Sequence, residues 1–236
     1  RGARFTAALG FDLEPATEAA IPGALEVFRR VSAERVREEW IKALKAPSPS
    51  RAFDAMARTG ILGVTLPVLS TTSDDASWAR SLAAVDACPL PVTSRLAALL
   101  HAVDLATLDA WLKATKFSND ERATVLLLLR SQPHGSPGEW SDADVRRWLQ
   151  GVGRDAARPT LDVAAALRGE AALGGLRARV ETALAEGVAL TTGDLAIDGN
   201  SLMTELAMRP SRELGDLLKW LLAQVIDDPS RNTRDA

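Results

Sequence analysis

Apolar residues recur along this chain at the three- and four-residue spacing of an α-helix, and this periodicity constrains the fold more than any other feature. Val36, Trp40 and Leu44 fall on one helical stripe, with charged residues around the rest of it. A broad apolar face near the C-terminus is formed by Leu214, Leu217, Leu218, Leu221, Leu222, Val225 and Ile226. No run of period-two alternation is long enough to predict a β-sheet. The sequence therefore predicts an all-α protein.

Capping signals mark where several of these helices begin. Ser118 is followed three residues later by Glu121, which is the pattern of a capping box. Ser141 to Asp144 and Thr191 to Asp194 are weaker versions of the same signal. We expect a helix to start at each of these points.

Two segments without apolar periodicity divide the chain. Residues 69–77 are rich in Ser, Thr and Asp, and residues 131–138 contain two prolines and two glycines. They predict three parts, at residues 1–70, 71–135 and 136–236. Phe5, Leu9 and Phe11, near the start of the first part, are most simply interpreted as core residues.

The composition excludes several classes of site and partner. The longest uninterrupted apolar run is Val125 to Leu129, far too short to span a membrane. One cysteine and two histidines are too few for a zinc cluster, and a single cysteine fits the reducing cytoplasm. A net charge of −3 argues against indiscriminate binding to nucleic acid, although it permits a local basic face.

Segments at opposite ends of the chain carry a resemblance to a known family. Residues 1–11 read R-G-A-R-F-T-A-A-L-G-F, and residues 195–203 read L-A-I-D-G-N-S-L-M. With residues 31–39, which match an S-x-E-R-I/V-R-E-E pattern, they resemble the class II bacterial tRNA nucleotidyltransferases (CCA-adding enzymes) and poly(A) polymerases. The resemblance implies that residues 1–70 form the neck, 71–135 the body and 136–236 the tail of such an enzyme.

The same resemblance implies that the catalytic head, with its D-x-D carboxylates, Mg²⁺ and bound ATP or CTP, lies outside this chain. One D-x-D does occur here, at Asp142 and Asp144, but it follows Ser141 at a predicted helix start. We interpret it as a helix cap, because acidic residues complement the amides of a first turn. No catalytic residue, metal site or cofactor is therefore expected within these residues, and the polypeptide alone is expected to be inactive.

Residues 96–103, L-A-A-L-L-H-A-V, resemble the L-A-A-L-L-H-D-I-G segment of HD-type phosphohydrolases, in which a histidine–aspartate pair ligates metal. Here Ala102 replaces that aspartate, and the other histidine, His134, lies in a Pro/Gly-rich segment. One imidazole without a carboxylate cannot hold a catalytic divalent ion. We therefore expect a degenerate HD region in the body, with His101 as a core histidine.

Positive charge is concentrated between residues 146 and 179. Seven arginines and three acids give this stretch a net charge of +4. Such a local basic region suits an RNA-binding protein, whereas scattered solvated positions on two or three helices are the open alternative. As surface residues, Arg146 and Arg147 are expected to contribute little to stability.

A second candidate for phosphate binding is the start of the last helix. Residues 210–215 resemble the family's P-G-P-x-I/L-G segment, with Arg212 as a cation and Gly215 permitting close approach. A tightly packed helix start is the structural alternative. The candidate RNA-binding residues are Arg1, Arg4, Arg146, Arg147, Arg154, Arg158, Arg177, Arg179, Arg212 and Gly215.

These observations lead to one preferred hypothesis for function. The chain would be the tRNA-binding part of a cytoplasmic CCA-adding enzyme, gripping the acceptor–T arm and presenting the 3′ end to the head domain. One alternative is an RNA-binding accessory region of a poly(A) polymerase. The other is an HD-type metal phosphohydrolase, which the Ala102 substitution disfavours.

Overall fold

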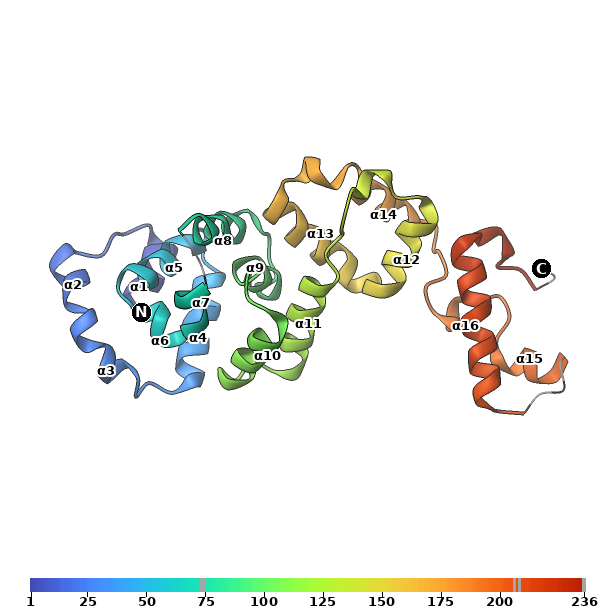
Figure 1. Ribbon diagram of the computed structural model, residues 1–236, viewed down its shortest axis with the longest axis horizontal. Coiled ribbons are helices and arrows are strands. Elements are labelled where there is room, and N and C mark those ends of the chain that lie inside the picture. The colour runs from blue at the N-terminus through green and yellow to red at the C-terminus, as the bar shows by residue number, and fades with distance from the viewer. Residues whose placement is uncertain (73–74, 206, 208, 235–236) are drawn as a thin grey trace. The chain divides into compact units, whose positions relative to one another are not determined.

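The computed structural model describes residues 1–72, 75–205, 207 and 209–234, and every regular element in these residues is a helix (Figure 1). The predicted all-α class is therefore confirmed. The α-helices are α1 (Gly2–Leu9), α2 (Pro15–Ala20), α3 (Leu25–Phe28), α4 (Ala33–Leu44), α5 (Pro49–Arg58), α6 (Ile61–Thr65), α7 (Pro67–Thr72), α8 (Asp75–Ala87), α9 (Val92–Leu99), α10 (Leu105–Ala114), α11 (Asn119–Arg130), α12 (Asp142–Val152), α13 (Arg154–Arg168), α14 (Leu176–Ala185), α15 (Gly199–Glu205) and α16 (Arg212–Asp227). Within the described residues, the helices are too short or too polar to cross a bilayer.

The chain forms two compact units. The first comprises residues 1–132 and 159–170, and the second comprises residues 133–158 and 171–236. Helix α13 contributes to both, and Pro159, a helix-weakening residue, lies at the point where it passes from one unit to the other. The predicted joint at 131–138 contains the first unit boundary. The predicted joint at 69–77 includes residues 73 and 74, which lie outside the described residues, and the three-part division stays a prediction.

An aromatic cluster lies in the core of the first unit. Trp40 of α4 packs against Phe53 of α5 and Trp111 of α10, with ring centroids 4.9 Å apart in both pairs. Trp111 donates its indole N–H to the carbonyl of Thr65 at 2.7 Å, so this polar group is satisfied in the core. Trp40 and Leu44 are buried and Val36 is partly buried, which confirms the stripe predicted from their spacing.

Two arginines of this unit form hydrogen bonds that connect segments distant in sequence. The Arg95 guanidinium donates to the carbonyls of Leu44, Ala46 and Cys88 at 2.7, 2.8 and 2.9 Å. Arg37 of α4 donates to both carboxylate oxygens of Glu121 on α11, each at 2.8 Å. Such charge-assisted bonds fix the ends of helices that are distant in sequence.

The interpretation of Phe5, Leu9 and Phe11 as core residues is wrong. Their exposed fractions are 41%, 56% and 65%. Helix α1 packs against α5 through the small residues Ala3 and Ala7, which are buried, so the large apolar side chains lie on its other faces. Small residues permit the close approach of two helices, and the sequence pattern alone does not reveal which face of α1 does so.

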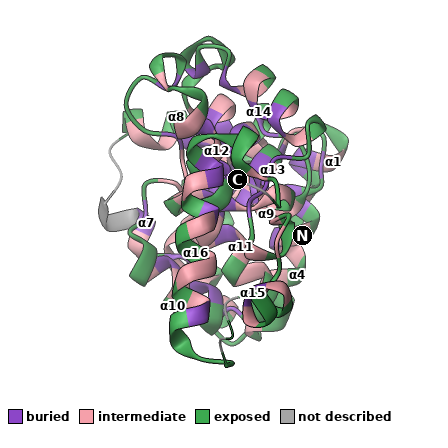
Figure 2. Cartoon of the chain, turned by 90° about the vertical axis from the view of Figure 1, so that its right-hand side faces the viewer, coloured by how far each residue is buried: buried purple, intermediate pink, exposed green. Residues whose placement is uncertain are grey.

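In the second unit, α12 and α14 bury apolar residues against each other, and α16 contributes to a separate small cluster. Leu222, Val225 and Ile226 are buried together with Ala189, while other faces of α16 are exposed (Figure 2). This confirms the apolar face predicted for the last helix. The capping boxes predicted at Ser118 and Ser141 are present with both reciprocal hydrogen bonds. At Thr191 the Asp194 carboxylate accepts from the Thr191 N–H and hydroxyl, and only a short 3₁₀ turn (Thr192–Asp194) follows.

Candidate nucleic-acid interface

Arg146 and Arg147 lie on α12 and reach the end of α16. Arg146 donates to the backbone carbonyls of Ile226 at 2.6 Å and Asp227 at 2.9 Å. Arg147 pairs with the carboxylates of Asp144 at 2.8 Å and Asp227 at 2.6 Å. Both side chains therefore connect two helices of the second unit, as well as carrying positive charge.

Three further candidates, Arg154, Arg158 and Arg179, also have acidic or carbonyl partners. Arg158 forms a two-bond pair with Glu181, with N–O distances of 2.7 and 2.6 Å. Arg179 pairs with Asp142 at 2.6 Å. Arg154 donates to the carbonyl of Val188 and lies 3.4 Å from the Asp194 carboxylate.

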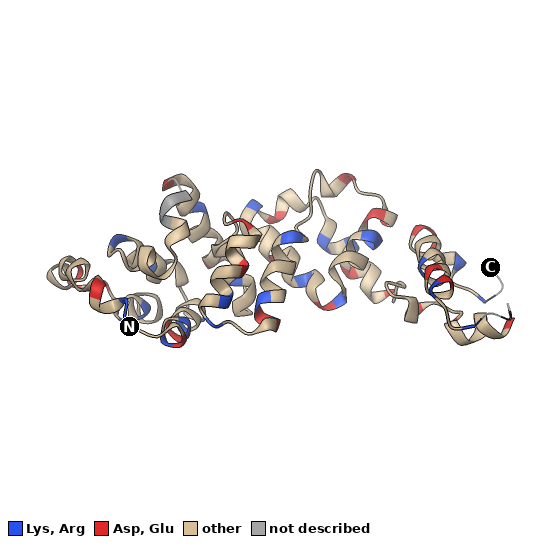
Figure 3. Cartoon of the chain, turned by 60° about the horizontal axis from the view of Figure 1, so that its bottom comes forward, with Lys and Arg blue, Asp and Glu red and all other residues tan. Residues whose placement is uncertain are grey.

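These partners change the interpretation of the +4 charge. Several acids that pair with these arginines lie outside residues 146–179 in sequence. They are Asp142, Asp144, Glu181, Asp194 and Asp227. Basic and acidic residues are accordingly interspersed in the structure (Figure 3). Each paired arginine retains donors that a phosphate can share, because a guanidinium has five N–H groups. The role of these arginines in RNA binding, that of Arg177 included, stays a prediction.

The hydrogen bonds of Arg146 lead us to revise the expectation that this residue contributes little to stability. Carbonyls in the last turn of a helix lack intrahelical donors, and Arg146 supplies donors to two of them. Arg147 matches the expectation better, since it and its two carboxylate partners are about half exposed.

Asp194 organises the connection between α14 and α15. Its carboxylate accepts hydrogen bonds from the backbone N–H groups of Leu190 and Thr191, both at 2.9 Å, and from the Thr191 hydroxyl at 3.0 Å. The hydrogen bond from Leu190, with those from Thr191 and Arg154, outweighs burial and lowers the pKa of Asp194 to about 2. The charged form of this side chain is thus part of the folded structure.

The start of α16 remains open to solvent. Ser211 caps the helix by accepting from the N–H of Leu214 at 3.3 Å, and the Arg212 side chain is 95% exposed. Arg212 has a loose pair with Asp216 at 3.7 Å. A Cβ placed on Gly215 would meet no atom within 4 Å, so a ligand can approach the backbone there. This geometry is compatible with a phosphate contact, and the contact itself stays a prediction.

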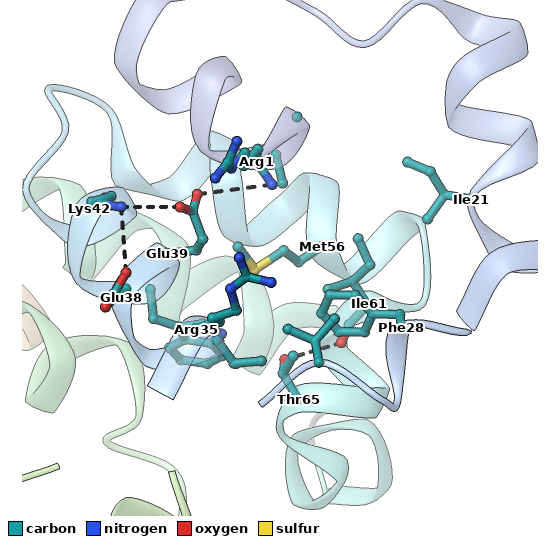
Figure 4. Close-up of a pocket in the computed structure, with 15 residues that line it drawn as sticks. Arg1, Ile21, Phe28, Arg35, Glu38, Glu39, Lys42, Met56, Ile61 and Thr65 are labelled. Atoms are coloured by element: carbon teal, nitrogen blue, oxygen red, sulfur yellow. Dashed lines mark hydrogen bonds and ion pairs between the residues drawn. The ribbon is translucent and has the colours of Figure 1, made fainter. Parts of the chain in front are cut away.

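Arg4 pairs with a carboxylate in the first unit. The Arg4 Nε lies 2.9 Å from Glu39, and Arg1 lines the pocket that this pair borders. Lys42 joins the same network at 3.3 Å from Glu39 and 3.9 Å from Glu38 (Figure 4). The two candidate arginines therefore stand at the edge of a mixed-charge cluster.

This cluster borders a pocket of about 610 Å³. Figure 4 shows Arg35 extending into it, while Phe28, Met56 and Ile61 supply apolar walls. Concave sites with apolar walls and a few polar groups are the usual form of small-molecule sites. The pocket lies within the first unit, beside the segment that matches the family's opening motif.

Metal ligation finds no support in the described residues. They contain no group of three His, Cys, Asp or Glu side chains that could hold a metal ion. Asp144 serves the capping box at Ser141 and Asp142 pairs with Arg179, which confirms that the D-x-D starts a helix. His101 is half-buried and lines a pocket, so it is not the core residue that the sequence predicted, and its Nδ1 contacts the carbonyl of Ala98 at 3.0 Å.

The structure also reveals basic side chains that the sequence did not single out. Within the described residues of the first unit, several cations form no side-chain hydrogen bond or ion pair. The sequence alone does not identify them, because whether a basic side chain has an acidic partner depends on which carboxylates the fold brings near it. They include Arg30, Arg35, Lys45, Arg80, Lys113, Lys116, Arg130 and Arg168.

The fold is that of a multi-helical protein with cations at several places on its surface, and comparison with known proteins identifies its family. The family model described as tRNA nucleotidyltransferase domain 2 (putative) matches residues 92–236, more than half of the chain. Another, described as the probable RNA- and SrmB-binding site of polymerase A, matches residues 10–72. The chain belongs to the tRNA nucleotidyltransferase and poly(A) polymerase family.

Individual relatives agree with this assignment. The CCA-adding enzyme of Lactobacillus delbrueckii subsp. bulgaricus is 29% identical over all of this chain, which covers 57% of that protein. The CCA-adding enzyme of Geobacillus stearothermophilus is 30% identical over 86% of this chain and 48% of its own length. The crystal structure of the Bacillus stearothermophilus CCA-adding enzyme in complex with CTP superposes on 96% of this chain with a TM-score of 0.74 and 25% identity. This chain spans a little over half the length of the curated relatives it matches along its full length.

Proposed function

We propose that this region binds tRNA and holds its 3′ end for CCA addition, a reaction carried out by a catalytic head domain outside this chain. The observation that carries the proposal is the match to CCA-adding enzymes along the full 236 residues. Such a region would act by positioning, because the rate of in-line attack by a terminal hydroxyl rises greatly when that hydroxyl is held in the correct orientation. A helical protein with cations at several places along the chain suits a long, structured partner.

The acceptor–T arm is the part of tRNA we expect this region to bind. A duplex RNA is recognised chiefly through its phosphates and 2′-hydroxyls, which calls for spaced cations and little base reading. Arg212 at the open start of α16 and the arginines of α12 to α14 provide such cations in the second unit. The D-x-D at Asp142 does not fit a two-metal site, since both carboxylates have structural partners, and we assign Mg²⁺ and the nucleotides to the head.

A footprint on tRNA tests this proposal. Hydroxyl-radical cleavage of a tRNA bound to the 236-residue polypeptide should show protection of the acceptor–T arm and little protection of the anticodon arm. Protection spread evenly over the molecule would contradict the proposal. Arg212→Glu should weaken binding more than Lys45→Glu, an exposed lysine at the end of α4 that changes the net charge equally. Equal weakening would show that only net charge matters.

A second candidate is an RNA-binding region of a poly(A) polymerase. The match of residues 10–72 to the polymerase A family model favours it specifically. This alternative predicts equal or stronger binding of single-stranded RNA, because such an enzyme extends RNA without selecting for the tRNA shape. The footprint then has no arm preference.

A further inference from the structure

A pocket of about 470 Å³ lies in the first unit, and its lining includes His101 of the HD-like segment but no residue of 1–11 or 31–39. It is formed by α8, the connection between α9 and α10, the end of α11 and the end of α13. Its volume is in the range of small-molecule sites in proteins. Its lining includes Arg80, His101, Asp104, Leu105, Leu129 and Arg168.

The charged groups of this pocket leave an excess of positive charge. Arg80 and Arg168 are exposed and form no ion pair within the described part of the chain. Asp104 is the one acid in the lining, and it caps α10 by accepting from the N–H of Thr107 at 2.9 Å. Burial and the neighbouring Arg80 charge lower the pKa of His101, so the imidazole is neutral at physiological pH. Two guanidinium groups without carboxylate partners therefore face one space.

Three helices end at this pocket, and the negative ends of their dipoles oppose an anion there. The structure reduces this effect, because several of the terminal carbonyls already accept hydrogen bonds. Gln132 donates to the carbonyl of Leu128 at 2.7 Å, and His101 contacts that of Ala98 at 3.0 Å. The arginines thus remain the groups available to a ligand.

The remaining walls are apolar. Val103, Leu105, Leu129 and Leu167 line the pocket, and Leu105 is 41% exposed. An inorganic anion alone would leave these side chains in water, whereas an aromatic or aliphatic ligand body would cover them. An arginine commonly binds a phosphate group through two parallel N–H bonds from its guanidinium.

We propose that this pocket binds a phosphorylated small molecule, with its phosphate between Arg80 and Arg168 and its apolar or aromatic body against Leu105 and Leu129. A nucleotide is the ligand class that combines these features. The inference goes beyond tRNA binding and does not depend on it.

Calorimetric titration of the 236-residue polypeptide with ATP, AMP, adenosine and inorganic phosphate tests the proposal. We expect ATP and AMP to bind, with adenosine and inorganic phosphate each binding more weakly because each supplies half of the contacts. Arg80→Gln and Arg168→Gln should each weaken nucleotide binding by about tenfold or more, the scale of one charge-assisted hydrogen bond. Arg30→Gln, an exposed arginine of the same unit outside the pocket, should leave binding unchanged.

Asp104→Asn supplies a variant with the opposite expected effect. Asparagine caps helices as well as aspartate does, so α10 should be preserved while one negative charge is removed from the pocket. Nucleotide affinity should therefore rise severalfold, a result that a purely structural role of these residues does not give. The proposal is overturned if neither ATP nor AMP binds at millimolar concentration. It is also overturned if all three arginine variants behave alike, or if Arg80 and Arg168 affect the binding of tRNA alone.

Discussion

Removal of the Arg146 side chain is expected to destabilise the second unit. Its guanidinium donates to two carbonyls at the end of α16, those of Ile226 at 2.6 Å and Asp227 at 2.9 Å. A hydrogen bond to a charged group contributes about 1.5–3 kcal/mol in mutational series. Because the site is partly open to water, we expect Arg146→Ala to lower the free energy of unfolding of this unit by about 2 kcal/mol in total.

Arg147→Ala is the matched control, one residue away and with the same change in charge. Arg147 and its carboxylate partners are about half exposed, so its loss should cost only about 0–1 kcal/mol. Urea unfolding followed by tryptophan fluorescence measures both variants, since Trp140, Trp148 and Trp220 lie in the second unit. An unchanged midpoint for Arg146→Ala, or equal shifts for the two variants, would refute the capping role.

Three further predictions follow from the structure. Asp194→Asn should destabilise the second unit at neutral pH. The folded pKa of Asp194, about 2, lies below the ordinary 3.8, so the stability that the carboxylate contributes is complete above about pH 4 and is lost as the pH falls through 2. The unfolding midpoints of the wild-type and Asp194→Asn proteins, measured over a pH series, should therefore converge in acid. Gly174→Ala should lower the free energy of unfolding by about 2–3 kcal/mol, because φ is +53° and a Cβ would lie 2.7 Å from the Cα of Gly138. Gly187→Ala, with φ of +68° and open space around the Cβ, should lower it by about 1 kcal/mol, and thermal melts compare the two variants. The 236-residue polypeptide, incubated with Mg²⁺, CTP, ATP and tRNA lacking CCA, should give no extended product on a sequencing gel, and any extension above a heat-killed control would contradict the assignment of catalysis to the head.

Local signals in the sequence were sufficient for the helices. The stripe at Trp40 and Leu44 and the cap at Ser118 depend on neighbours within one or two turns, and both are present in the structure. Helix α1 shows the limit of this reasoning. Its buried face consists of Ala3 and Ala7, so the larger Phe5 and Leu9 misled a prediction based on hydrophobicity alone.

The candidate site was less predictable, because its charge balance is set by tertiary contacts. Arg158 and Glu181 are 23 residues apart, and Arg147 and Asp227 are 80 apart. A count of charges over one stretch of sequence cannot include such partners. The same limitation hid Arg80 and Arg168, whose significance arises from the pocket that four separate segments form around them.

The binding preference of the polypeptide for intact tRNA tests the central proposal most directly. Its affinity for a tRNA and for an unstructured RNA of equal length should be compared over a range of salt concentrations. We predict tighter binding of the tRNA at every concentration, with affinity falling as salt rises because phosphate contacts release counterions. Equal or tighter binding of the unstructured RNA, or no binding of either, would contradict the account.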